Sequence, residues 1–252
     1  MLCAHVLLSV EFIPTLFFPA ENSTEIYPKP QNSSLRTPTD AELSAIITFA
    51  KEELGLRTVM SPMFDPDYDL ILNGQGDPGA GRAQWGVKMN DTWIAEWFTN
   101  YGHWIMHYAK LAQDLGMDTF HAMHELHTMG TNASLTPQWR SLLTDVRVRG
   151  ELFSMTCRSS SHFRDVFCCL SQSVFDGEVS VAFNGNPFFK DVARGGIGYI
   201  DLLDSIGLDC YWPLVTELPE QPWQRPGVDV VAKAWEPWVC CRVCCAMHTV
   251  YG

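Results

Sequence analysis

The segment GMDTFHAMHE, residues 116–125, decides the fold of this chain. It follows a long helical pattern that Gly116 ends, and its apolar run predicts a strand that carries Glu125 at its C-terminal end. In parallel α/β folds, catalytic groups collect where the strands end. Glu125 is therefore the first candidate for a catalytic residue. A salt-bridged structural glutamate would produce the same local pattern, so the residue pattern alone leaves both interpretations open.

Short apolar runs alternate with helical patterns on both sides of this segment, which is typical of βα units and a parallel sheet. The first helix begins at a capping box, Thr39 to Glu42, and its pattern ends at Gly55. The predicted strands are residues 10–18, 57–64, 117–125, 178–183 and 208–214, and the predicted helices begin near residues 39, 90, 136 and 197, the last of them stopping at Gly207.

The bulk properties restrict the partners. The 252 residues are 46% apolar, enough for a sizeable core, and the net charge of −12 comes without any Lys/Arg block. Such a chain repels phosphate backbones and anionic membranes, so neither nucleic acid nor a membrane is an expected partner. No stretch reaches the roughly 18 uncharged apolar residues of a membrane span.

The asparagines favour a secreted glycoprotein. Four of the eight lie in N-x-S/T sequons, at Asn22, Asn32, Asn90 and Asn132. The N-terminal segment, residues 1–19, lacks a basic start and a small-residue cleavage pattern, so a buried strand is favoured there over a signal peptide.

Two segments break the βα rhythm, at about residues 150–174 and 239–252. We expect a barrel-type domain over residues 1–238 with a foreign insertion at about 150–174, and a Cys-rich tail outside the domain. The tail pattern Cys240-Cys241-x-x-Cys244-Cys245 resembles half of a zinc site or one end of a disulfide knot. Because no second pair of ligands follows, we predict neither a metal site nor a cofactor.

Three histidines near Glu125 offer a different chemistry. His121, His124 and His127 lie three residues apart, whereas zinc-binding helices place two histidines four apart. On a regular strand, residues 121, 123 and 125 share one face and His124 points away. A His-based metal hydrolase is therefore the weaker alternative. An inward-facing Glu125 beside Met123 would be partly desolvated, and burial favours the protonated form of a carboxyl group, which suits a proton donor.

Several short motifs together resemble glycoside hydrolase family 113. The resemblance covers about residues 8–148 and 175–238. Its motifs are Thr37–Leu43, Val59–Asp65, Arg82–Trp85, the segment Trp97–Ala109, His124–Leu126, Trp139-Arg140, Ala182–Asn184 and Gly207–Leu214. The resemblance implies a (β/α)8 barrel and retaining hydrolysis of β-1,4-linked mannan or a related β-glycan.

By this resemblance, Glu125 is the general acid/base after the fourth barrel strand. The residues expected to contact sugar are Arg82, Trp85, His124, Asn184, Tyr211 and Trp212. Structural alternatives stay open, because either tryptophan could only pack, Arg82 could only pair with a carboxylate, and Asn184 could only cap a turn.

The second carboxylate of a retaining enzyme is not found. In the family it is a glutamate on a late strand, but the family-like sequence ends near Trp238, and the nearby Glu217 and Glu236 do not end apolar runs. The first barrel strand is also not found. We therefore expect an incomplete barrel that is inactive or weak as written, with a non-catalytic carbohydrate-binding fragment as the alternative.

Overall fold

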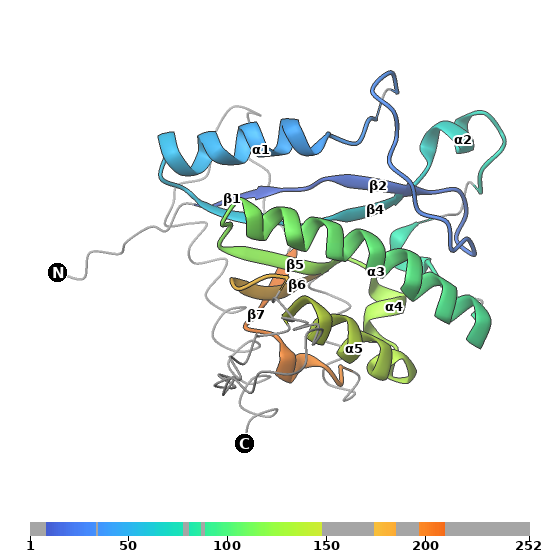
Figure 1. Ribbon diagram of the computed structural model, residues 1–252. Coiled ribbons are helices and arrows are strands. Elements are labelled where there is room, and N and C mark those ends of the chain that lie inside the picture. Colours follow the sequence, from blue (N-terminus) through green and yellow to red (C-terminus); the bar gives the residue numbers. More distant parts are fainter. Residues whose placement is uncertain are drawn as a thin grey trace, which may run out of the picture.

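A computed structural model describes residues 9–33, 35–77, 81–86, 89–147, 174–184 and 197–209 (Figure 1). Its main feature is a five-stranded sheet in which every neighbouring pair is parallel and the strand order follows the chain. The strands are β1 (Ser9–Phe12), β3 (Arg57–Met60), β5 (Thr119–His124), β6 (Glu178–Asn184) and β7 (Ser205–Asp209).

Two of these strands continue beyond a proline. β2 (Thr15–Phe18) and β4 (Met63–Pro66) form a second parallel pair, and each follows its predecessor after Pro14 or Pro62. Proline lacks the amide hydrogen that a ladder needs, so the regular pattern stops there. Two backbone hydrogen bonds cross the break, from Ser61 N to Phe12 O (2.9 Å) and from Met63 N to Pro14 O (3.0 Å).

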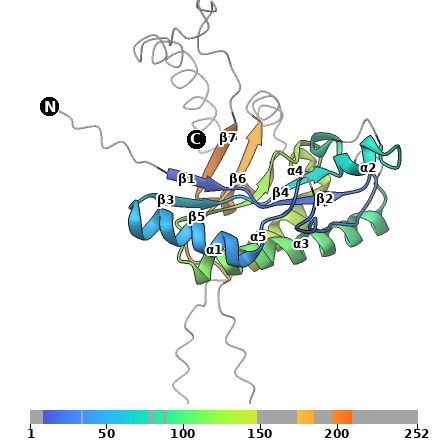
Figure 2. The same cartoon turned by 90° about the horizontal axis from the view of Figure 1, so that it is seen from above.

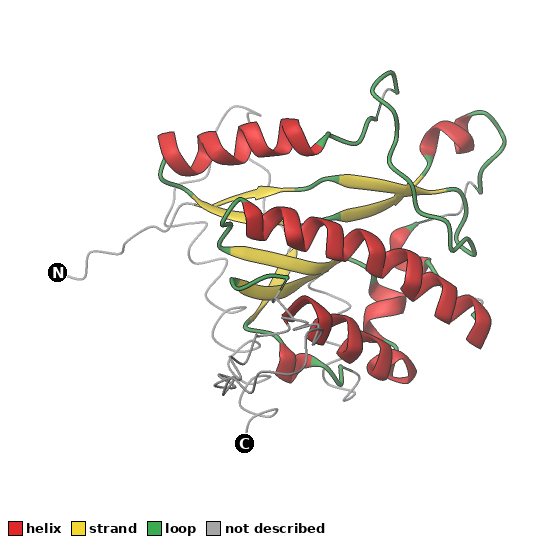
Figure 3. Cartoon of the chain, in the orientation of Figure 1, coloured by secondary structure: helices red, strands yellow, loops and turns green. Residues whose placement is uncertain are grey.

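The long helices cover one face of the sheet. Figure 2 shows α1 (Asp40–Thr48), α3 (Asp91–Asp114) and α5 (Thr136–Arg147) on the same side of the strands. The capping box predicted at Thr39 starts α1, and the Asn90 side chain caps α3 by accepting from Trp93 N. The shorter elements, coloured by type in Figure 3, are α2 (Tyr68–Leu72), α4 (His127–Thr131), a π-helical turn (Phe49–Glu53) and 3-10 turns at Arg82–Gln84, Ala133–Leu135 and Ile200–Leu202.

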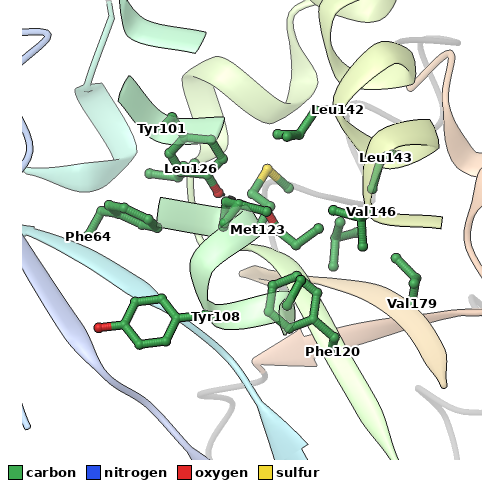
Figure 4. Close-up of a cluster of buried hydrophobic side chains, with 14 of the residues drawn as sticks. Phe64, Tyr101, Tyr108, Phe120, Met123, Leu126, Leu142, Leu143, Val146 and Val179 are labelled. Carbon is green, nitrogen blue, oxygen red and sulfur yellow. Dashed lines mark hydrogen bonds between the residues drawn. The ribbon is translucent and has the colours of Figure 1, made fainter. Parts of the chain in front are cut away.

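The core fills the space between the sheet and these helices. Tyr101 of α3 is fully buried and donates its hydroxyl to Ala122 O (2.9 Å) at the end of β5. Figure 4 shows Met123 among this cluster, together with side chains of α3, α5, β5 and β6. The aromatic stripe of α3 is therefore core, with Trp97 stacked on Tyr101 at 4.4 Å.

The parallel α/β prediction is confirmed, and the curled sheet with its outer helices is an incomplete (β/α) barrel. The helix predicted over residues 197–206 is wrong, because the chain forms only the turn Ile200–Leu202 before β7 begins at Ser205. Gly207 ends no helix. It lies in β7 opposite Ala182, where a side chain would contact the His121 ring.

The proposed insertion at 150–174 lies almost wholly outside the described residues, as does the Cys-rich tail. Within the described part of the chain, no helix has both the length and the apolar character of a membrane span.

Candidate functional site

Four polar residues mark the carboxyl ends of the strands. Asp65 lies at the end of β4, Glu125 directly follows β5, Asn184 ends β6 and Asp209 ends β7. Parallel strands bring their carboxyl ends to one rim, so these side chains belong to the same end of the barrel. Asn184 and Asp209 are register partners across β6 and β7.

Glu125 has an unusual backbone and an enclosed side chain. Its φ of 51° lies in the left-handed region, which costs a non-glycine residue about 1–2 kcal/mol. Its amide donates to Ala182 O (2.8 Å), which holds this backbone against β6. The side chain is 10% exposed, and Oε1 is buried without a hydrogen-bond partner among the described residues. A buried carboxylate oxygen without a hydrogen-bond partner costs free energy unless a ligand donates a hydrogen bond to it.

Arg82 bridges two carboxylates across the rim. Its Nε and Nη2 donate to Glu125 Oε2 at 3.1 and 2.9 Å, and its Nη1 donates to Asp65 Oδ1. Burial lowers the pKa of the guanidinium, but the charges of Asp65 and Glu125 outweigh this and raise it overall. Arg82 thus pairs with carboxylates, the structural alternative to a sugar contact, and it fixes the position of Glu125.

Trp85 packs inside the domain. Its side chain is 0% exposed and stacks on Phe18 with ring centroids 4.1 Å apart and planes 9° apart. The indole Nε1 donates to Ser23 O at 2.8 Å. No face of the ring is open for a sugar in this structure. Trp85 therefore packs in the core, which was the structural alternative to a sugar contact.

Strict alternation predicted that His124 points away from the other site residues. This prediction is wrong. The pairing of β5 with β6 shifts register between His121 and His124, and this irregularity brings both imidazoles onto Ser61. Ser61 Oγ lies 2.7 Å from His124 Nδ1 and 3.1 Å from His121 Nδ1. The same shift leaves Met123 on the helix side of the sheet, in the core, rather than beside the carboxyl group of Glu125.

A carboxylate stands at each end of this pair of histidines. His121 Nδ1 lies 3.2 Å from Glu11 Oε1 of β1, and His124 Nε2 lies 3.4 Å from Asp209 Oδ2. His124 is 3% exposed. Together, Glu11, Ser61, His121, His124 and Asp209 form an inner cluster.

The inner cluster has opposing electrostatic influences. Burial lowers the pKa of His124, although the neighbouring carboxylates act in the other direction. Burial raises the pKa of Asp209, reinforced by Glu125 and Glu11 and opposed by His124. The hydrogen bond from His121 lowers the pKa of Glu11, which overcomes partial burial.

Some of the remaining predicted residues lie outside the part of the chain that the structure describes. Tyr211 and Trp212 lie outside the described residues, as do the possible nucleophiles Glu217 and Glu236. His127 belongs to α4 rather than to the inner cluster. Within residues 9–147, 174–184 and 197–209, gaps excepted, no group of three His, Cys, Asp or Glu side chains is arranged to hold a metal ion.

Sequence reasoning missed four members of the site. Asp65 directly follows the predicted strand 57–64, so the rule that found Glu125 would have found it too, whereas Asp209 lies near the start of the predicted strand 208–214 and only the observed β7 ends there. Glu11 and Ser61 carried no comparable signal, because their role depends on strands that are far apart in the sequence.

Comparison with known proteins agrees with this architecture. The model of glycoside hydrolase family 113 matches residues 5–173. A solved complex of a family 113 β-1,4-mannanase has a TM-score of 0.56 and 20% identity, covering 82% of this chain and 53% of that chain. The family 113 β-mannanase AaManA from Alicyclobacillus acidocaldarius, in complex with ManMIm, has a TM-score of 0.55 and 18% identity, covering 91% of this chain and 56% of that chain.

No curated protein matches the chain. The chain spans about half the length of the mannanase structures that it matches. At this level of identity, the likeness to the solved structures establishes the fold alone.

Proposed function

Because the chain belongs to glycoside hydrolase family 113, as the match over residues 5–173 shows, we propose that it hydrolyses β-1,4-linked mannan or a related β-glycan with Glu125 as general acid/base. The substrate class is suggested by the structural relatives, which are β-1,4-mannanases.

The observation that carries this proposal is the carboxyl group of Glu125. It is nine-tenths buried at the carboxyl end of β5, with Oε2 held by Arg82 and Oε1 without a partner among the described residues. In a retaining reaction such a group first protonates the departing glycosidic oxygen, and its carboxylate then deprotonates the attacking water. Oε1 is the oxygen available for both transfers, because Arg82 occupies the other.

Retention requires a second carboxylate about 5–5.5 Å away, which attacks the anomeric carbon and forms a covalent glycosyl-enzyme. Glu217 and Glu236, the candidates for this nucleophile, lie outside the described residues.

Substitution of Glu125 tests the assignment. With a substrate whose leaving group needs a proton, such as a mannan oligosaccharide, Glu125→Gln should lower kcat/KM by about 10²-fold or more. The leaving group of a dinitrophenyl β-mannoside departs without a proton. With this substrate, Glu125→Ala should still carry out the first step, in which the glycosyl-enzyme forms. Added azide should then accelerate turnover of this variant and give the β-mannosyl azide.

Glu178→Gln is the matched control, since Glu178 begins β6 at the opposite end of the barrel and pairs with Arg57 at 3.4 Å. It should keep activity. Undiminished hydrolysis by Glu125→Gln would contradict the assignment. Mannan binding without release of reducing ends by the unaltered chain would point to a non-catalytic carbohydrate-binding protein.

We also propose that the chain is a secreted glycoprotein. The sequon residues Asn22, Asn32 and Asn90 are exposed, and Asn90 uses its side-chain oxygen rather than its amide nitrogen in the α3 cap. In protein from eukaryotic secretory cells, removal of N-glycans by an amidase should increase gel mobility, and each Asn→Gln variant should remove one step. Unchanged mobility would contradict this proposal.

A further inference from the structure

The α3 cleft is a hollow between α3 and the loop that follows β2. Its volume is about 380 Å³, and it is lined by residues 24–26 of the loop and by Glu96, Asn100, His103 and Trp104 of α3. Clefts that hold small ligands have volumes of about 300–1,000 Å³. None of the polar residues at the carboxyl ends of the strands lines this cleft, so it is separate from the site of Glu125.

The helical spacing explains why these side chains of α3 face outward. Trp97 and Tyr101 are fully buried and belong to the core between the helices and the sheet. Glu96, Asn100 and His103 follow one another at intervals of four and three residues, so they share a different face of the helix. Glu96 and His103 are exposed.

Three hydrogen bonds between lining residues hold the loop against α3. Asn100 Nδ2 donates to Thr24 O at 2.9 Å, and Thr24 Oγ1 donates to Glu96 Oε1 at 2.9 Å. Trp104 Nε1 donates to Ile26 O at 3.3 Å. The walls of the cleft are therefore fixed before a ligand enters, which lowers the entropic cost of binding.

Several polar groups of the lining are available to a ligand. The exposed side chains of Glu25 and His103 make no hydrogen bond or ion pair within the described part of the chain. Glu96 Oε2 and Asn100 Oδ1 are likewise unused among the described residues. The carboxylates only accept hydrogen bonds, whereas the amide and the imidazole can also donate them.

This lining fits a neutral sugar better than an ion. No lysine or arginine is among the described residues that line the cleft, and its two glutamates repel anions. An ammonium group only donates hydrogen bonds, whereas a sugar hydroxyl donates and accepts and so matches both kinds of group in the lining. Trp104 adds aromatic surface against which the C–H face of a pyranose ring can pack.

We propose that the α3 cleft is a second glycan-binding site, which takes a neutral hexose unit of a β-1,4-linked glycan. The choice of glycan rests on the proposed function, but the cleft shares no residue with the site of Glu125. A polysaccharide held at α3 has a raised effective concentration at the carboxyl ends of the strands, because its remaining segments stay near the protein.

A titration with β-1,4-mannohexaose tests the site directly. The protein is first freed of N-glycans, because the sequon at Asn22 lies beside the loop of the cleft, and it carries Glu125→Gln so that the oligosaccharide is not consumed. The indole N–H signal of Trp104, assigned with Trp104→Phe, should shift as the ligand is added. An unmoved signal would overturn the proposal. So would a response to butylammonium chloride without a response to the oligosaccharide, which would assign the cleft to cations.

The double variant Glu25→Ala with His103→Ala removes two lining groups that hold no other described residue in place. It should fold and should weaken the binding seen at Trp104 by about tenfold, since two hydrogen bonds to the sugar are lost. Glu52→Ala is the control, because Glu52 is exposed in the π-helical turn after α1, and it should leave the affinity unchanged. Equal affinity in the double variant and the control would overturn the proposal.

Hydrolysis separates this proposal from the assignment of Glu125. In the chain with an unaltered Glu125, the double variant should cleave a dinitrophenyl β-mannoside at the usual rate and degrade insoluble mannan about threefold more slowly or worse. Equal losses on both substrates would overturn the proposed role of the cleft. The expected shifts at Trp104 would support the second site even if no glycan is cleaved.

Discussion

Glu125 shows how a residue can be placed against its local preferences. A left-handed backbone, a side chain removed from water and an unsatisfied oxygen each cost free energy. Arg82 and the backbone bond to Ala182 hold the residue in that state. Such local costs are typical of positions whose geometry serves a reaction rather than stability.

Gly86 is a residue whose substitution the structure predicts to be harmful. It follows Trp85 with φ +86°, and an added Cβ would lie 2.4 Å from Met129 Sδ. Gly86→Ala combines left-handed strain with overpacking and should lower the free energy of unfolding by about 2–4 kcal/mol.

Gly55→Ala is the matched control, because Gly55 has φ +62° with nothing within 4 Å. It should cost only the left-handed preference, about 1 kcal/mol. Denaturant unfolding of both variants measures the difference. Equal costs would show that Met129 relaxes without penalty and that the steric argument is incorrect.

The sequence predicted the position of Glu125 because a strand's apolar run and its end are local properties. It did not predict the surroundings of His124, since the register shift in β5 depends on pairing with β6. Nor could it distinguish a buried Trp85 from an exposed one, because both are consistent with an aromatic residue in a loop. Pairing partners and burial are decided by distant segments.

At the scale of elements, a buried ion pair ties the long loop after β2 to the start of α2. Lys29 is 5% exposed, and its Nζ lies 2.5 Å from Asp67 Oδ1 and 4.5 Å from the centre of the Phe17 ring. Tyr27 also donates to Asp67, at 2.7 Å, and Asp67 caps α2. The loop is therefore fastened by charge as well as by packing.

Removing one charge of this pair should be costly. Asp67→Asn leaves the Lys29 ammonium buried without its closest counter-charge, so we expect a loss of about 3 kcal/mol in unfolding free energy at pH 7. Burial raises the pKa of Asp67, but the bonds from Lys29 and Tyr27 outweigh burial and lower it overall. The stabilisation by the Asp67 carboxylate is thus fully present above its pKa in the unfolded chain, about 4. It is lost as the pH falls through the lower pKa of Asp67 in the folded protein.

The difference in stability between the wild type and Asp67→Asn should accordingly shrink below about pH 4. Asp114→Asn, which breaks an exposed pair with Lys110 on α3, should change stability by less than about 0.5 kcal/mol at any pH. A difference for Asp67→Asn that stays constant from pH 7 to pH 2 would show that the charge of Asp67 is not responsible.

At the scale of the molecule, the alternation of strands and helices predicted the parallel sheet. This succeeded because each βα unit carries its own periodicity. The inner cluster could not be predicted, since it is assembled from β1, β5, β7 and the residue after β3, inside a barrel where apolar layers are the rule. Segments without a clear period gave no structural expectation at all.

Gly207 has a consequence for how relatives of this chain can vary. A Cβ at 207 would stand 3.4 Å from His121 Cε1, which is van der Waals contact, so the further atoms of a larger side chain would compete with the His121 ring for space. The two positions share one volume although 86 residues separate them in the chain. They should therefore covary during evolution, so that sequences with a bulkier residue at the position of Gly207 carry a smaller one at the position of His121.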